Sequence, residues 1–228
     1  MKFLWLFFLS FILIDITLPA QPVSGTGQDR IISRFEFAAG VSRSMNSGYY
    51  DFLPKYGYSL GIGVVHAFSP SFELGLRTLW EMKGSKMEQH NYGVSESGPI
   101  DKTRSIDTEF NYVTFAIAPV FRTGKKKRIF LGAGGYYSLL KSGTIEESEI
   151  DHITNTTTTH RHVDLRNLST KYDAGAMAFF GYSLFNTKSG YASAQLVYSK
   201  GLIDVTDVWN HYQRNDSFML MVTYNIFR

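Results

Sequence analysis

The sequence predicts an all-β fold, an eight-stranded antiparallel up-and-down transmembrane β-barrel with short periplasmic turns and long extracellular loops. Three observations lead to this prediction. The chain of 228 residues contains 14 Tyr, 18 Phe and 20 Gly but only 6 Pro, a composition that favours strands and close backbone turns. Beyond residue 30, apolar and polar side chains alternate with a period of two. Long and short connections between the segments that show this period follow one another in alternation along the chain.

Composition excludes several classes of function. The chain has no Cys, which excludes a disulfide framework, a thiolate zinc site, a Cys nucleophile and a lipid anchor attached through cysteine. A formal net charge of +3 is too small to indicate nucleic acid as a partner. The length suits a single domain.

The first residues have the pattern of an export signal. Lys2 precedes an apolar run of about a dozen residues, and Ala20 offers a small side chain for cleavage. The run is too short for a membrane-spanning helix, which needs about 20 residues and is the alternative as an uncleaved anchor. We therefore expect a cleaved signal peptide at residues 1–20, a periplasmic segment at 21–32 and the barrel at 33–228.

Alternation defines the strands in chain order. The clearest run is 72–83, where Phe72, Leu74 and Leu76 point one way and Glu73 and Arg77 point the other. The same test predicts strands at 33–43, 57–68, 72–84, 108–122, 128–142, 171–184, 191–202 and 216–227.

The connections set the topology. Three are tight, at 69–71, 123–127 and 185–190, and four are long and polar, at 44–56, 85–107, 143–170 and 203–215. Tight periplasmic turns alternating with long extracellular loops are typical of bacterial outer-membrane barrels. An even number of strands then places both termini on the periplasmic side.

A soluble eight-stranded barrel would also alternate, but with its apolar face inward. Here one face is bulky throughout and the opposite face is small or polar, as in Gly132, Gly134, Ser138 and Ser193. A narrow lumen has room for only a limited volume of side chains. The pattern therefore favours a barrel with its bulky face toward lipid.

Five charged residues are predicted to face the lumen: Glu73, Arg77, Glu81, Lys83 and Asp173. Buried charges must be paired, so we expect a structural charge network in which Arg77 bridges the carboxylates of its own strand and Asp173. The alternative is a proton or ion path, which a filled barrel disfavours.

The tight turn at 123–127 continues into a basic cluster, Lys125, Lys126, Lys127 and Arg128. It is either a solvated turn that discourages strand pairing or a periplasmic contact for anionic headgroups or a protein.

The longest loop contains His152, His160 and His162 among acidic residues. Imidazoles and carboxylates are metal ligands, but a solvated Thr-rich loop explains the same composition. We expect no metal and no cofactor. Catalysis is not expected either, because His66 has no acidic partner by register.

Aromatic residues in the first and last long loops have two interpretations, an interfacial girdle and a binding surface for another protein. They are Tyr49, Tyr50, Phe52, Tyr56, Trp209 and Tyr212.

Four segments together resemble the PorT-like family of outer-membrane β-barrel proteins, common in Bacteroidota. They are residues 110–121 (FNYVTFAIAPVF), 129–140 (IFLGAGGYYSLL), 172–175 (YDAG) and 198–205 (YSKGLIDV). The resemblance covers roughly residues 33–228. It implies an eight-stranded barrel in the outer membrane, and the founding member takes part in protein secretion and gliding machinery.

We therefore expect a structural or protein-interaction role in the cell envelope. The expected partners are outer-membrane lipid and a protein of an envelope or secretion complex. The alternatives are a small-solute pore and a lipid-modifying enzyme.

Overall fold

The computed structural model describes residues 33–48, 52–95, 98–124, 126–163, 170–186, 190–205 and 213–227. The predicted signal peptide and the segment at 21–32 lie outside these residues. Within the described ranges, no helix is both long and apolar enough to cross a membrane.

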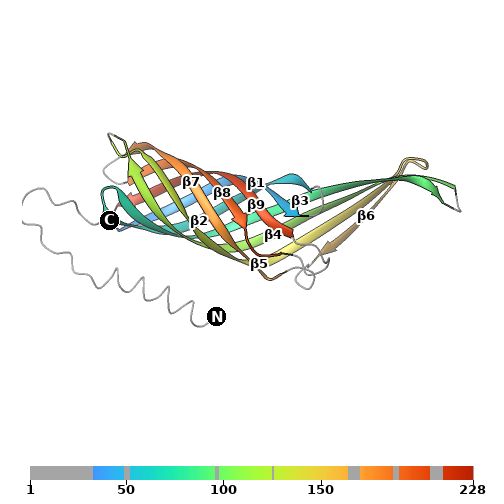
Figure 1. Ribbon diagram of the computed structural model, residues 1–228, viewed down its shortest axis with the longest axis horizontal. Helices are drawn as coiled ribbons and strands as arrows, with labels where there is room; N and C mark the ends of the chain where they lie inside the picture. Colours follow the sequence, from blue (N-terminus) through green and yellow to red (C-terminus); the bar gives the residue numbers. More distant parts are fainter. Residues whose placement is uncertain are drawn as a thin grey trace, which may run out of the picture.

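The described chain forms one antiparallel sheet that closes on itself (Figure 1). β1 pairs with both β2 and β9, and β4 pairs with β5, so the ring has no break. β6 pairs with β5 alone and stands outside the ring. The strands are β1 (Ser33–Gly48), β2 (Phe52–Ser69), β3 (Phe72–Ser95), β4 (Gly98–Thr123), β5 (Ile129–Asp151), β6 (Thr156–Val163), β7 (Tyr172–Asn186), β8 (Gly190–Gly201) and β9 (Gln213–Phe227).

The prediction of an eight-stranded up-and-down barrel is confirmed, since every strand except β6 belongs to the ring. The β2–β3 turn, the end of β4 and the start of β5 lie at one end, together with the end of β7, the start of β8, the start of β1 and the end of β9 (Figure 1). In bacterial outer-membrane barrels this end faces the periplasm.

The prediction of loops at 85–107 and 143–170 is wrong over much of their length. β3 and β4 remain paired as far as Ser95 and Gly98. β5 and β6 remain paired as far as Asp151 and Thr156. The two hairpins project beyond the barrel at the end opposite the tight turns (Figure 1). Polar side chains occur on both of their faces and the few apolar ones are scattered, so the period-two signal that marks a half-buried strand is missing. Backbone pairing is nevertheless favourable because it satisfies the peptide groups of both strands.

The outward face of the ring forms an apolar belt. Phe35, Leu60, Ile117, Leu196 and Phe218 each expose about half of their side chain, which in water would be an unusually large apolar surface. In a bilayer these side chains contact hydrocarbon, and the closed ring of described strands has no open edge within it. The predicted segregation of bulky residues to one face is confirmed.

The inward face is packed by pairing large side chains with glycines across neighbouring strands. Phe130 lies opposite Gly181, and Phe179 lies opposite Gly132. A Cβ atom at either glycine would collide with the ring opposite it. Tyr136 with Gly175, Leu79 with Gly61 and Arg77 with Gly63 repeat the arrangement. Each large side chain therefore lies over the strand beside it, and the lumen is filled.

This packing predicts that Gly63 cannot be enlarged. A Cβ atom there would lie 2.6 Å from the carbonyl oxygen of Leu76 and 3.1 Å from Cγ of Arg77. We expect Gly63→Ala to lower the free energy of unfolding by about 1–3 kcal/mol, the usual cost of overpacking. Urea unfolding in detergent micelles measures it.

The matched control is Gly75→Ala, because a Cβ atom at Gly75 meets only the carbonyl oxygen of Ala118, at 3.7 Å. Equal stability of the two variants would show that the lumen is loosely packed at Gly63.

Candidate functional site

The lumen holds a charged cluster in its extracellular half. Nζ of Lys83 lies 3.4 Å from Oε2 of Glu81 and 3.5 Å from Oδ2 of Asp173. All three side chains are buried. Asp173 also accepts hydrogen bonds from Tyr136, at 3.3 Å, and from Asn215, at 3.2 Å. Lys83 Nζ lies 4.6 Å from the centroid of the Tyr136 ring, a favourable cation–π contact.

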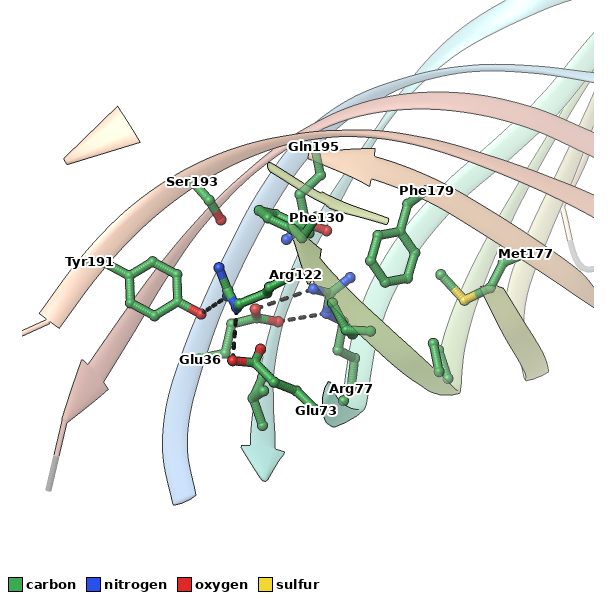
Figure 2. Close-up of a pocket in the computed structure, with 15 residues that line it drawn as sticks. Glu36, Glu73, Arg77, Arg122, Phe130, Met177, Phe179, Tyr191, Ser193 and Gln195 are labelled. Atoms are coloured by element: carbon green, nitrogen blue, oxygen red, sulfur yellow. Dashed lines mark hydrogen bonds and ion pairs between the residues drawn. The ribbon is translucent and has the colours of Figure 1, made fainter. Parts of the chain in front are cut away.

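A second cluster occupies the periplasmic half (Figure 2). Arg77 on β3 binds Glu36 on β1 through Nε and Nη2, the bidentate arrangement that guanidinium and carboxylate groups favour. Glu73 accepts two cations on one oxygen: Oε1 lies 2.7 Å from Nη2 of Arg34 and 2.7 Å from Nε of Arg122.

Aromatic rings and hydroxyls complete this periplasmic cluster. Arg122 donates to Ser183 at 3.2 Å and to the hydroxyl of Tyr191. The guanidinium carbons of Arg34 and Arg122 lie 5.3 and 5.0 Å from the centroid of the Tyr191 ring. Together these contacts fix the guanidinium groups among side chains of several strands.

The prediction that Arg77 bridges the carboxylates of its own strand and Asp173 is wrong. Its carboxylate partner is Glu36, and Glu73 and Glu81 pair with other cations. Residues four apart on a strand are separated by about 13 Å, too far for one guanidinium to reach. Arg77 instead crosses over Gly63, which lies between it and Glu36 in the register of β1, β2 and β3.

Sequence reasoning did not single out Arg34, Glu36 or Arg122. Arg34 and Glu36 share the inward parity of Ala38 and Ser42 on β1, and this parity is the signal that could have identified them. Of the five predicted lumen residues, the structure brings Glu81, Lys83 and Asp173 together and places Glu73 and Arg77 in the other cluster.

Buried apolar side chains lie between and around the two clusters, and we call them the apolar layer. On β3 it is represented by Leu79, midway between Arg77 and Glu81. The buried side chains of this layer and its surroundings are Ala38, Leu79, Ala116, Ala118, Val120, Phe130, Tyr136, Met177, Phe179, Val197, Met219 and Met221. The lumen therefore holds more apolar side chains than the expectation of a small, polar lumen with a few apolar exceptions, such as Leu79 and Phe179, allowed. The pairing of large residues with glycines makes room for apolar side chains inside.

A small cavity of about 20 Å³ adjoins the periplasmic cluster. Arg77, Arg122, Tyr191 and Gln195 are among its lining residues (Figure 2). It has room for one or two water-sized species.

The basic turn lies at the periplasmic end, between β4 and β5. Lys126, Lys127 and Arg128 are exposed, and Lys125 lies outside the described residues. Ile129 and Leu131 on the lipid-facing belt follow directly, so these cations stand at the edge of the apolar belt. The structure is compatible with either predicted role, a solvated turn or a contact for anionic groups.

Ion pairs join neighbouring strands of the extracellular hairpins. Nζ of Lys102 on β4 lies 2.6 Å from Oε1 of Glu149 on β5, and the carboxylate raises the pKa of Lys102. The Asp151 carboxylate accepts backbone N–H groups of Thr154, at 3.0 Å, and Ile153, at 2.9 Å, which lower its pKa. These contacts define the β5–β6 turn.

The predicted histidine group is dispersed. His152 approaches Thr103 on β4, whose Oγ1 lies 2.9 Å from Nε2 of His152 and 2.8 Å from Nδ1 of His90. His160 lies on β6 opposite Glu147, and the side chain of His162 is outside the description. Among the described residues, no three His, Asp or Glu side chains converge as a metal site.

Two other predicted sites are partly described. Tyr56 is exposed and Phe52 partly so, whereas Tyr49, Tyr50, Trp209 and Tyr212 lie outside the described residues. His66 has a partner that sequence reasoning missed, because Nδ1 lies 2.8 Å from Oγ of Ser33. Ser33 is paired with His66 across β1 and β2. Within the described chain, no carboxylate contacts the imidazole.

A closed ring with an apolar exterior and a packed interior defines an outer-membrane β-barrel protein. The model of the outer membrane protein beta-barrel domain family matches residues 20–207. The chain belongs to this family.

Several solved structures are similar in outline. The attachment invasion locus protein Ail of Yersinia pestis has a TM-score of 0.37 at 13% identity, with 86% of this chain and 99% of that chain covered. Neisserial surface protein A has a TM-score of 0.42 at 13% identity, covering 83% and 95%. The outer membrane protease OmpT of Escherichia coli has a TM-score of 0.37 at 9% identity, covering 91% and 98%.

Similarities this distant carry no argument about function. No curated protein sequence matches the chain.

The Glu36–Arg77 pair predicts strong coupling. Arg77→Met leaves the Glu36 carboxylate buried without its cation, so we expect a loss of about 3–5 kcal/mol in the free energy of unfolding. The double variant Glu36→Gln with Arg77→Met leaves no unpaired charge at these two positions. It should therefore recover much of the lost free energy of unfolding.

The double-mutant cycle is measured by urea unfolding in one detergent. Additive effects of the two substitutions would contradict the pairing.

Proposed function

We propose that this barrel has a structural or protein-interaction role in the cell envelope, with no catalysis and no transport of solutes through its lumen. The observation that carries the proposal is the filled lumen. Leu79 of the apolar layer lies on β3 between Arg77 and Glu81. It packs with other buried apolar side chains, Met219 and Met221 among them, and an apolar constriction of this kind opposes ion passage. The surfaces that remain for function are therefore the lipid-facing belt, the periplasmic turns and the extracellular hairpins.

The extracellular hairpins favour protein interaction. β6 has β5 as its one neighbour among the described strands, and residues 156–161 on it are exposed. An open sheet edge presents unpaired peptide groups to an extended segment of another protein. The hairpins also expose apolar side chains near their turns: Tyr92, Val94 and Ile153 expose 74%, 86% and 53%.

A lipid-modifying enzyme has weaker support. The hydrogen bond between Ser33 and His66 supplies a hydroxyl and a base, but the imidazole has no carboxylate to orient it in the described chain. We interpret the pair as a contact between two neighbouring strands near the periplasmic boundary.

Within its family, we place the chain in the PorT-like group, on the four segments that resemble it. In the structure these segments lie in β4, in β5, at the start of β7 and at the end of β8. The finer inference is that the partner belongs to a protein secretion or gliding complex, as for the founding member of that group.

Photo-crosslinking in intact cells tests the interaction role. We expect a benzophenone side chain in place of Tyr92 or Ile153 to form a discrete protein adduct, because both positions are exposed on the extracellular hairpins. The same side chain in place of Leu196, on the lipid-facing belt, is the matched control.

Denaturing gels after irradiation are the measurement, followed by identification of the adduct. An absence of adducts at both hairpin positions would count against this role for the hairpins. Phospholipid hydrolysis by the purified barrel, abolished by Ser33→Ala, would contradict the proposal of no catalysis.

A further inference from the structure

The periplasmic half of the lumen has an excess of positive charge. Three guanidinium groups, Arg34, Arg77 and Arg122, face two carboxylates, Glu36 and Glu73. The exposed fraction of each of these side chains is 11% or less. Three cations and two anions leave a net charge of +1 in the described part of this cluster.

Among the described residues, the other strands around this periplasmic cluster contribute no further charged side chain to it. Their side chains around the cluster are uncharged: Val65 on β2, Phe130 on β5, Met177, Phe179 and Ser183 on β7, Tyr191, Ser193 and Gln195 on β8, and Thr223 and Asn225 on β9. A guanidinium group does not lose its proton in a protein, so all three arginines remain cationic.

Compensation from the other charged cluster is indirect. Glu81 lies four residues beyond Arg77 on β3, a separation of about 13 Å, and Leu79 of the apolar layer stands between them. A buried charge without a close counter-charge is costly. The cluster therefore favours an additional anion close to the guanidinium groups.

The cavity beside the cluster offers suitable donors. Nε and Nη2 of Arg77 are occupied by Glu36, whereas Nη1 donates to no described residue and is turned away from that carboxylate (Figure 2). Gln195 is buried, and its Oε1 has no partner in the described chain. Gln195 lines the cavity, and rotating its amide by half a turn exchanges the positions of Oε1 and the NH₂ group. The rotation also leaves Oε1 facing the Thr223 hydroxyl, to which the amide nitrogen now donates at 3.4 Å.

Size restricts the ligand. A cavity of about 20 Å³ accepts a species about as large as one or two water molecules. We propose that the cavity binds one monatomic anion of halide size, held by Arg77 and Gln195 and attracted by the excess charge of Arg122.

The test is anomalous diffraction from crystals of the detergent-solubilised barrel grown with bromide as the sole halide. We expect a bromide peak inside the lumen, within hydrogen-bond distance of Arg77. Arg122→Gln leaves two cations and two anions, with Glu73 still paired to Arg34, so the peak should be lost. Arg128→Gln, an exposed substitution in the β4–β5 turn, is the matched control and should keep the peak.

Each outcome decides the proposal. A lumenal peak in the unsubstituted barrel and in Arg128→Gln, but not in Arg122→Gln, supports it. Water density without anomalous signal, or bromide only at exposed cations, overturns it. If Arg122→Gln does not fold, the unsubstituted barrel alone decides. The result is independent of the proposed interaction role, which depends on the extracellular hairpins.

Discussion

Closure of the sheet is the constraint on which the rest of this structure depends. A bilayer offers no hydrogen-bond partners to peptide groups, so every strand edge inside it must be paired. The pairing of β1 with β9 satisfies that requirement, and with eight strands it also fixes a narrow interior. Every inward side chain must then fit beside a neighbour, and every inward charge must find an opposite charge.

The interior meets this constraint in two ways. Large side chains lie over glycines of the neighbouring strand, as Phe130 does over Gly181 and Arg77 over Gly63. Ionised groups are collected into two clusters, one around Lys83 and one around Arg77. Apolar packing fills the section between them. Because the lumen is occupied in this way, the surfaces that remain for partners are on the outside of the barrel.

The strands were predictable from the sequence because lipid and lumen impose opposite demands on alternate residues. Strand 72–84 shows this in Phe72, Glu73 and Leu74, whose parity is evident without any structure. Which side chains of a strand face the lumen follows from the alternation along that strand and can be derived from its sequence alone. For the same reason Lys83 and Asp173 could be assigned to the lumen before their contact was known.

Contacts across strands could not be derived in the same way. Glu36 meets Arg77 because the registers of β1, β2 and β3 bring Glu36, Gly63 and Arg77 into one row, and strand spacing carries no information about register. The hairpin extensions were missed because polar side chains occur on both of their faces and no regular alternation is left. His152 was grouped with neighbours in sequence, whereas its hydrogen-bond partner Thr103 comes from the adjacent strand β4.

The central claim is that the lumen is closed by packed side chains, and planar-bilayer recording tests it most directly. The unsubstituted barrel should show no conductance steps, because packed side chains fill its lumen. The double variant Leu79→Ser with Met221→Ser, which makes two buried members of that layer polar, should conduct. Regular conductance steps from the unsubstituted barrel would contradict the account.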